Sequence, residues 1–217
     1  MVSGENDPRR HGTIWMLNLD EEPCTVIPRV RADFRRLTLD LAPALASSTG
    51  LLPLTEITKR LENGRQCYTA WVDGQIVVYG WVSLEEEGIG ELNLRIKLLP
   101  GEAYIWDCAT LSSFREKGLY SALLAYILGE LRLQGLCRAW IGADYDNLAS
   151  QKGMSKAGFH HVADLAIERV LAMRQVWVMG LPGVPESIVI EARRAFLNDR
   201  DKVWTNAISS TIQEDHK

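Results

Sequence analysis

The residues best suited to chemistry lie at positions 115–121, where a short polar segment leads into a long amphipathic stretch. The segment reads Arg-Glu-Lys-Gly-Leu-Tyr-Ser, and Gly118 stands where a helix would begin. The first N–H groups of a helix lack internal partners, and the helix dipole adds positive potential, so such an end suits a phosphate or pyrophosphate. Arg115 and Lys117 add charge, and Gly118 has no Cβ to keep an anion away. The segment is neither a Walker loop nor a G-x-G-x-x-G turn, so its residues alone also allow an ordinary loop that leads into a helix.

A carboxylate just upstream is the candidate general base. Asp107 falls within an otherwise apolar predicted strand at 104–109. Strand alternation places Asp107 and Ala109 on one face, opposite Trp106 and Cys108. Burial there would raise the pKa of the carboxyl and suit it to proton transfer. The alternative is a structural carboxylate that is hydrogen-bonded or faces solvent.

Other reactive residue types form no recognisable cluster. The four cysteines form no CxxC pair and are expected to be reduced thiols. His160 and His161 are adjacent and directly precede the predicted strand at 162–169. Adjacent residues of a strand point to opposite faces and no further ligands accompany them, so no metal site is predicted. Asp144 or Asp146 is expected to cap the helix that follows Asn147.

Size and charge narrow the class of protein. The chain has 217 residues and a net charge of −4, which argues against a protein built to coat nucleic acid. The N-terminus lacks the apolar core of a signal peptide, and no apolar run approaches the roughly 18–20 residues of a membrane span. We expect a cytoplasmic protein without membrane or nucleic-acid partners, and a homodimer is left open.

Hydrophobic periodicity and turn signals predict a mixed α/β chain. Asp73-Gly74 separates two β-rich runs and indicates a hairpin with a two-residue turn. Pro43 is expected to end or kink the first helix. The predicted elements, in order, are a strand at 13–19, helices at 29–42 and 54–61, strands at 67–72, 75–82, 91–98 and 104–109, a helix at 118–134, a strand at 138–143, a helix at 147–157, strands at 162–169 and 175–179, and a helix at 185–198.

Two motifs, the first at 115–120 and the second at 147–159, resemble those of the GNAT acyltransferases. That family carries Arg/Gln-x-x-Gly-x-Gly/Ala at a strand-to-helix turn, and Arg115, Gly118 and Tyr120 occupy the three fixed positions here. A helix that opens at Asn147 and closes at Gly-Phe, positions 158–159, is similar to the family's second motif. The resemblance covers roughly residues 67–179. Tyr120 departs from it by replacing a small residue, and the strand at 91–98 is an insertion.

The resemblance implies a fold, its limits and a ligand. The fold would be a mixed, mostly antiparallel sheet with a splayed central strand and flanking helices. The chain would consist, in order, of a flexible N-terminus at 1–11, a GNAT-like domain at 12–182 and a C-terminal helical extension and tail at 183–217. The ligand would be acetyl-CoA or another acyl-CoA, with no metal. The residues implied in binding it are Cys108, Thr110, Leu111, Arg115, Glu116, Lys117, Gly118, Leu119, Tyr120, Ser121, Asn147 and Ser150.

The implied activity is transfer of the acyl group to an amine by direct attack on the thioester. Asp107 is the candidate base, and a backbone N–H near Thr110 or Leu111 would polarise the thioester carbonyl. The family often has a tyrosine at the position of Met154 to protonate the leaving thiolate, so here Tyr120 or Tyr145 is the candidate acid.

The acceptor is left as a small-molecule or peptide amine. Four arginines within 29–36 form a basic cluster on the first predicted helix, which is either a solvated face or a site for a carboxylate-bearing acceptor. The competing interpretation of the whole chain is an acyl-CoA-binding regulatory module with little turnover.

Overall fold

An eight-stranded sheet forms the centre of the computed structural model, which describes residues 10–89, 94–170 and 173–197. The strands are β1 (Arg10–Asn18), β2 (Asp33–Arg36), β3 (Gln66–Val72), β4 (Gln75–Ser83), β5 (Glu86–Ile89), β6 (Leu94–Lys97), β7 (Glu102–Thr110), β8 (Arg138–Asp144), β9 (His160–Val170) and β10 (Met173–Gly180). In the main sheet they follow the order β10–β9–β1–β8–β7–β4–β3–β2, and β5 pairs with β6 apart from it. Only β7 and β8 are parallel neighbours in the described sheet, so the predicted mixed, mostly antiparallel class is confirmed.

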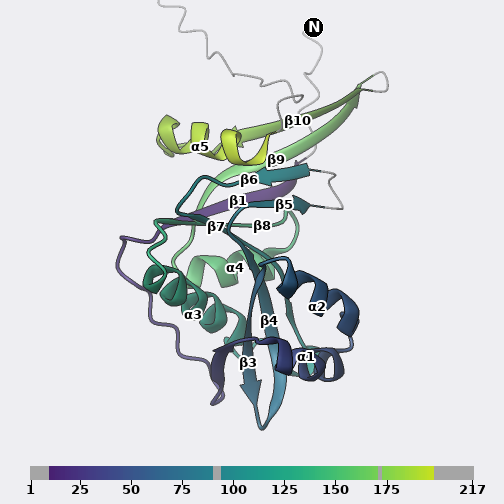
Figure 1. Cartoon of the computed structure of the whole chain (residues 1–217). Helices are drawn as coiled ribbons and strands as arrows, with labels where there is room; N and C mark the ends of the chain where they lie inside the picture. The colour runs from purple at the N-terminus through teal and green to yellow at the C-terminus, as the bar shows by residue number, and fades with distance from the viewer. Residues whose placement is uncertain (1–9, 90–93, 171–172, 198–217) are drawn as a thin grey trace, which may run out of the picture.

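Helices cover both faces of this sheet (Figure 1). They are α1 (Ala42–Thr49), α2 (Leu54–Glu62), α3 (Leu119–Leu133), α4 (Leu148–Lys156) and α5 (Glu186–Phe196). The apolar sides of α3 and α4 pack on one face, whereas α1, α2 and α5 pack on the other. β1 shows the division most simply, because Ile14 faces the α5 core and its neighbour Trp15 faces the α3 core. No helix in the described ranges is long and apolar enough to cross a membrane.

The predicted helix at 29–42 is wrong. Residues Asp33–Arg36 instead form β2 at the sheet edge, where Phe34 pairs with Ala70 of β3. The amide of Leu37 continues the pairing by donating to the carbonyl of Cys67 at 2.8 Å. Pairing with a distant strand therefore outweighs the helical spacing of the apolar residues. Pro43 lies in the first turn of α1 instead of ending a helix, because the first turn needs no N–H from that position.

The signals for the hairpin turn and for the two ends of the predicted helix at 118–134 are confirmed. Asp73 and Gly74 have φ values of 49° and 80°, as a type I′ hairpin turn requires. Gly118 precedes the first residue of α3, and Gly135 follows its end with a φ of 77°. In β6, Leu94 and Ile96 are buried and their neighbours are exposed, as the alternation predicted. Residues 91–93 of that predicted strand, the segment 1–9 and the tail from 205 lie outside the described residues.

The C-terminal helix α5 packs into the same core as the sheet. Phe196 makes edge-to-face contacts with Tyr104 of β7 and Trp140 of β8, at centroid distances of 6.0 and 5.9 Å. Both carboxylate oxygens of buried Glu102 accept hydrogen bonds from Arg194 of α5, at 2.7 and 2.6 Å. These contacts tie α5 to the start of β7, so this helix supports the strand that carries the candidate site.

We expect Phe196→Ala to destabilise the protein by about 3–5 kcal/mol, the usual cost of truncating a buried phenylalanine. Phe196 is 2% exposed, whereas Ile190 on the same helix is 55% exposed. Ile190→Ala is therefore the matched control and should change the free energy of unfolding by less than about 0.5 kcal/mol. Urea denaturation of both variants measures the difference. Equal effects would show that α5 does not belong to the cooperative core.

Candidate active site

β7 and β8 run parallel at the centre of the sheet and then separate. Their residues pair from Glu102 with Arg138 to Ile105 with Ile141, and no pairing joins the described segments 106–110 and 142–144. On its other side β7 stays paired with β4 as far as Thr110. We call these two unpaired strand ends the fork. Backbone groups along the fork have no strand partner and are available to hydrogen-bond a ligand.

β7 carries a bulge next to the fork. Gly80 of β4 lies alone opposite two residues of β7, Asp107 and Cys108. Asp107 has a φ of 41°, in the left-handed region that aspartate tolerates better than most residues. The bulge breaks the side-chain alternation, because Trp106 and Asp107 both contact Arg60. The prediction that Asp107 faces away from Trp106 is therefore wrong.

Cys108 points to the opposite side of β7, into the core beneath α3. A Cβ on Gly80 would lie 2.9 Å from its Sγ, so the bulge needs glycine at position 80. Burial, and then the charge of Asp107, raises the pKa of the Cys108 thiol to about 12. All four cysteines are free, and a thiol that stays protonated at neutral pH is a poor nucleophile.

The amides of Thr110 and Leu111, the two candidates for polarising the thioester carbonyl, point to opposite edges of β7. The N–H of Leu111 donates to the carbonyl of Val77 at 2.9 Å, and the carbonyl of Leu111 accepts from Phe114 at 2.8 Å. The expectation that the Leu111 amide faces a ligand is therefore wrong. Successive N–H groups of a strand point to opposite edges, so the amide of Thr110 points away from β4 and into the fork.

The turn before α3 offers an uninterrupted row of amides. Among the described residues, none accepts a hydrogen bond from the backbone N–H groups of 116–121. The first intrahelical bond of α3 is the one from Ala122 to the carbonyl of Gly118, at 3.1 Å. Glu116 and Gly118 have φ values of 61° and 76°, and left-handed residues in a turn draw successive N–H groups together into an anion-binding concavity. The predicted phosphate turn thus has the required backbone geometry.

The connection from β1 to β2 borders this turn, which the sequence did not indicate. The amide of Arg29 donates to the carbonyl of Lys117 at 2.8 Å. A Cβ on Gly118 would lie 3.5 Å from Cα of Pro28, which is ordinary contact. The positive φ therefore favours glycine at this position, and lack of space does not require it. The ammonium of Lys117 lies 4.6 Å from the centroid of the Phe114 ring, and Arg115 is exposed. Two backbone segments and two cations therefore surround the turn.

α4 begins at Asn147, across the fork from β7. The side-chain oxygen of Asn147 accepts a hydrogen bond from the amide of Ser150 at 3.1 Å. Asn147 is therefore the cap itself, and the expectation that Asp144 or Asp146 caps this helix is wrong. Its side-chain NH₂ has no partner among the described residues, so it can donate to a ligand in the fork.

Tyr120 turns its ring onto α4. A Cβ on Gly153 would lie 2.5 Å from Cδ1 of Tyr120, so glycine at 153 makes room for the ring. Burial, with smaller contributions from Cys108 and Tyr104, raises the pKa of Tyr120 well above its ordinary value, so the hydroxyl stays protonated. No described residue shares a hydrogen bond with that hydroxyl. Tyr145 is exposed beyond the end of β8, and its amide donates to the carbonyl of His11 at 3.0 Å.

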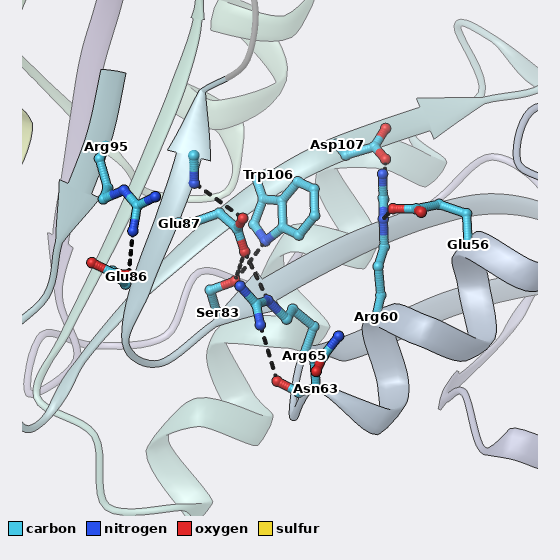
Figure 2. A network of polar contacts seen from close by, with 11 residues as sticks. Glu56, Arg60, Asn63, Arg65, Ser83, Glu86, Glu87, Arg95, Trp106 and Asp107 are labelled. Atoms are coloured by element: carbon cyan, nitrogen blue, oxygen red, sulfur yellow. Dashed lines mark hydrogen bonds and ion pairs between the residues drawn. The ribbon is translucent and has the colours of Figure 1, made fainter. Parts of the chain in front are cut away.

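Asp107 lies in a cluster of charged and aromatic side chains from three elements. Figure 2 shows Arg60 extending from α2 toward Asp107, with Glu56 of the same helix beside it. Arg60 forms ion pairs with Asp107 and, at 2.9 Å, with Glu56. The hydroxyl of Tyr79 lies 3.4 Å from Oδ1 of Asp107. The carboxylate is 30% exposed, so the buried carboxyl expected from the apolar strand is not what the structure shows.

The sequence profile of the acetyltransferase (GNAT) family matches residues 32–159, more than half of the chain. The chain belongs to the GNAT acetyltransferase family. The match includes the bulge, the turn at 116–121 and all of α4, and it leaves out β1, β9, β10 and α5. No curated protein matches the sequence of this chain.

Solved GNAT structures share the fold at low sequence identity. An acetyltransferase from Colwellia psychrerythraea matches with a TM-score of 0.50 and 17% identity over 70% of this chain and 53% of its own. A GCN5-related N-acetyltransferase from Sphaerobacter thermophilus has a TM-score of 0.51 and 15% identity over 71% and 49%. An acetyltransferase from Streptococcus pneumoniae has a TM-score of 0.50 and 15% identity over 70% and 98%. The chain thus spans about half the length of the first two proteins.

GNAT enzymes use acetyl-CoA, and the residues present fit such a ligand. Six consecutive amides at 116–121 lack an acceptor among the described residues, as a pyrophosphate site requires. The amide of Thr110 and the side chain of Asn147 offer donors on the two sides of the fork. In place of the tyrosine that the GNAT pattern often has, Met154 is buried and has no proton to donate. The ring of Tyr120 lies against Gly153, the residue that precedes Met154 in the chain.

Proposed function

We propose that the protein transfers an acyl group, acetyl in the first place, from an acyl-CoA to an amine by direct attack on the thioester. The observation that carries this proposal is the row of amides at 116–121 at the open end of the fork. Membership of the GNAT family and the donors of Thr110 and Asn147 support the same ligand. The thiol of Cys108 stays protonated at neutral pH, which disfavours a covalent acyl relay.

The amides of 116–121 would hold the pyrophosphate, with Arg115 and Lys117 adding positive charge. The backbone of Cys108 and Thr110 would bind the pantetheine arm from β7, and Asn147 and Ser150 would bind it from α4. Acetyl-CoA supplies the activated acyl group when it is bound.

Three groups of the chain would then serve the transfer. The amide of Thr110 is a donor for the thioester oxygen as negative charge develops on it. Asp107 would accept a proton from the ammonium of the acceptor, which must be neutral to attack. Tyr120 would donate its proton to the departing sulfur, and Tyr145 is the alternative donor.

A second candidate function is an acyl-CoA-binding module with little turnover. The specific observation in its favour is Met154, which cannot act as the acid that the GNAT pattern often supplies. For the transferase we propose a small-molecule or peptide amine as the acceptor, and for either function we propose the cytoplasm as the compartment.

Free-thiol release separates the two candidates. Purified protein is mixed with acetyl-CoA and longer acyl-CoAs, each with a panel of amines, amino acids and peptides. The proposed function predicts thiol release that depends on one class of amine and is fastest with the acetyl donor. Binding of acetyl-CoA without amine-dependent release across the panel would replace it with the regulatory module.

We expect Tyr120→Phe to lower kcat by about 10²-fold, the lower end of the range for loss of a general acid, with an unchanged Kd for acetyl-CoA. The substitution removes the hydroxyl and keeps the ring that packs on Gly153. Met154→Leu, which conserves volume and polarity, is the control and should stay within about threefold of the wild type. Steady-state kinetics, with the amine that the thiol-release assay identifies, measures kcat for both variants. An unchanged kcat in Tyr120→Phe would move the acid to Tyr145 or to water.

A further inference from the structure

Arg60 occupies an unusually constrained position beside the candidate base. Its guanidinium carbon lies 5.1 Å from the ring centroid of Trp81 and 4.6 Å from that of Trp106. The two indoles lie on neighbouring strands, with centroids 6.2 Å apart. The Arg60 side chain is 16% exposed although it starts from a surface helix. The guanidinium therefore lies over two neighbouring aromatic rings, and each contributes a cation–π attraction.

The edge of the same guanidinium is bonded to two carboxylates. Nη1 pairs with Oδ2 of Asp107, and Nε pairs with Oε1 of Glu56 at 2.9 Å. Burial alone would lower the pKa of Arg60, but the hydrogen bonds to Asp107 and Glu56 outweigh it and raise the pKa above its ordinary value. The hydrogen bond from Arg60 in turn lowers the pKa of Glu56. Arg60 is thus a fixed cation with an ionised carboxylate of its own helix as a second anchor.

Asp107 has little else to orient it. It lies on a bulge, in a left-handed backbone conformation, and its carboxylate is 30% exposed. The hydroxyl of Tyr79, at 3.4 Å from Oδ1, is at the long end of hydrogen-bond distance. Arg60 engages Oδ2 and leaves Oδ1 with this weak contact. Without Arg60 the carboxylate would be free to rotate about its short side chain.

We infer that Arg60 is a positioning residue for acyl transfer: it fixes the carboxylate of Asp107 through Oδ2 so that Oδ1 is presented to the acceptor amine. This inference rests on the proposed function, in which Asp107 is the base. Lysine cannot replace Arg60 in this role, because an ammonium lacks the planar set of N–H donors with which the guanidinium bonds two carboxylates at once while it lies over the two rings.

Arg60→Ala and its rescue by guanidinium test the inference. We expect kcat for the amine to fall by about 10²-fold, the usual effect of misplacing a reacting group by about 1 Å, while the Kd for acetyl-CoA stays within about twofold. The substitution vacates the space over the rings of Trp81 and Trp106, next to both carboxylates. Millimolar guanidinium chloride, compared with equal sodium chloride, should therefore restore a substantial part of kcat.

Arg65→Ala is the matched control. Arg65 lies in the other half of the same network, where it bonds Glu87 at 3.1 Å and the carbonyl of Asn63 at 3.1 Å (Figure 2). Its loss should leave kcat unchanged and show no response to guanidinium. An equal fall of kcat in Arg65→Ala, or a folded Arg60→Ala variant that guanidinium does not rescue, would overturn the inference. Should Arg60→Ala fail to fold, Arg60→Lys is measured instead, and wild-type kcat in that variant would also overturn it.

The double variant Arg60→Ala/Asp107→Asn separates this inference from the proposed function. If Arg60 acts through Asp107, removing Arg60 costs nothing further once Asp107 is asparagine. A further loss as large as in the wild-type background would mean that Arg60 acts independently of Asp107. Near-normal turnover of Asp107→Asn alone would instead remove the base from the proposed function, whatever Arg60→Ala shows.

Discussion

Gly118→Glu is expected to abolish acetyl-CoA binding while the protein stays folded. The turn at 116–121 presents amides without acceptors among the described residues, and the substitution places a carboxylate where they would meet pyrophosphate. Each hydrogen bond to a charged group contributes about 1.5–3 kcal/mol, so losing two weakens binding by on the order of 10²–10⁴-fold. Calorimetric titration with acetyl-CoA measures the loss.

Gly118→Asn is the control for backbone strain. Position 118 has a φ of 76°, which asparagine tolerates better than most residues and which Glu116 shows to be accessible to a side chain in this turn. We expect the asparagine variant to lose no more than about thirtyfold in affinity, from strain of about 1–2 kcal/mol at most. Wild-type affinity in folded Gly118→Glu would contradict the assignment of this turn to the pyrophosphate.

Asp107→Asn is expected to lower turnover by about 10²–10⁴-fold, the range for loss of a general base, and to leave the Kd for acetyl-CoA unchanged. Asparagine has nearly the same shape, so the bulge with its positive φ is retained. The change removes the anion that would take a proton from the acceptor ammonium. Steady-state kinetics at saturating acetyl-CoA gives the ratio.

The same substitution breaks the ion pair with Arg60, so its structural effect needs a control. Arg60 keeps its bond to Glu56 at 2.9 Å, and circular dichroism checks that the variant is folded. Asp40→Asn removes an exposed carboxylate from a part of the chain away from the fork and should leave turnover unchanged. Near-normal turnover in Asp107→Asn would return Asp107 to a structural role, which its ion pair alone would explain.

Features of the fold that depend on neighbours in the sequence could be predicted, and those that depend on distant strands could not. The Asp73-Gly74 turn and the start of α3 at Gly118 follow from local backbone preferences. The error at β2 has the opposite cause, since Phe34 is held by Ala70, a partner that helical spacing does not reveal. β1 is likewise the first strand of the chain yet lies between β8 and β9, and nothing in its own residues specifies that place.

The candidate site divides in the same way. The backbone geometry of the turn at 116–121, which we propose to bind pyrophosphate, was predictable because its amides belong to one continuous segment. The surroundings of Asp107 were not, because a single bulge reverses the face on which a strand residue lies. Arg60 is 47 residues away from Asp107 in the chain, and no spacing rule joins a residue of α2 to a bulge on β7. The glycine at 80, where a Cβ would meet Cys108, was the one local sign of the bulge.

The most direct test of the account is to identify the product of a complete reaction. Wild-type protein is incubated with acetyl-CoA and the amine panel, and mass spectrometry of the amines is combined with quantification of free CoA thiol. The account predicts an amine heavier by one acetyl group, formed in equal amount with free thiol and absent with Gly118→Glu. Tight binding of acetyl-CoA with no acetylated amine, or acetylation that Gly118→Glu leaves intact, would contradict it.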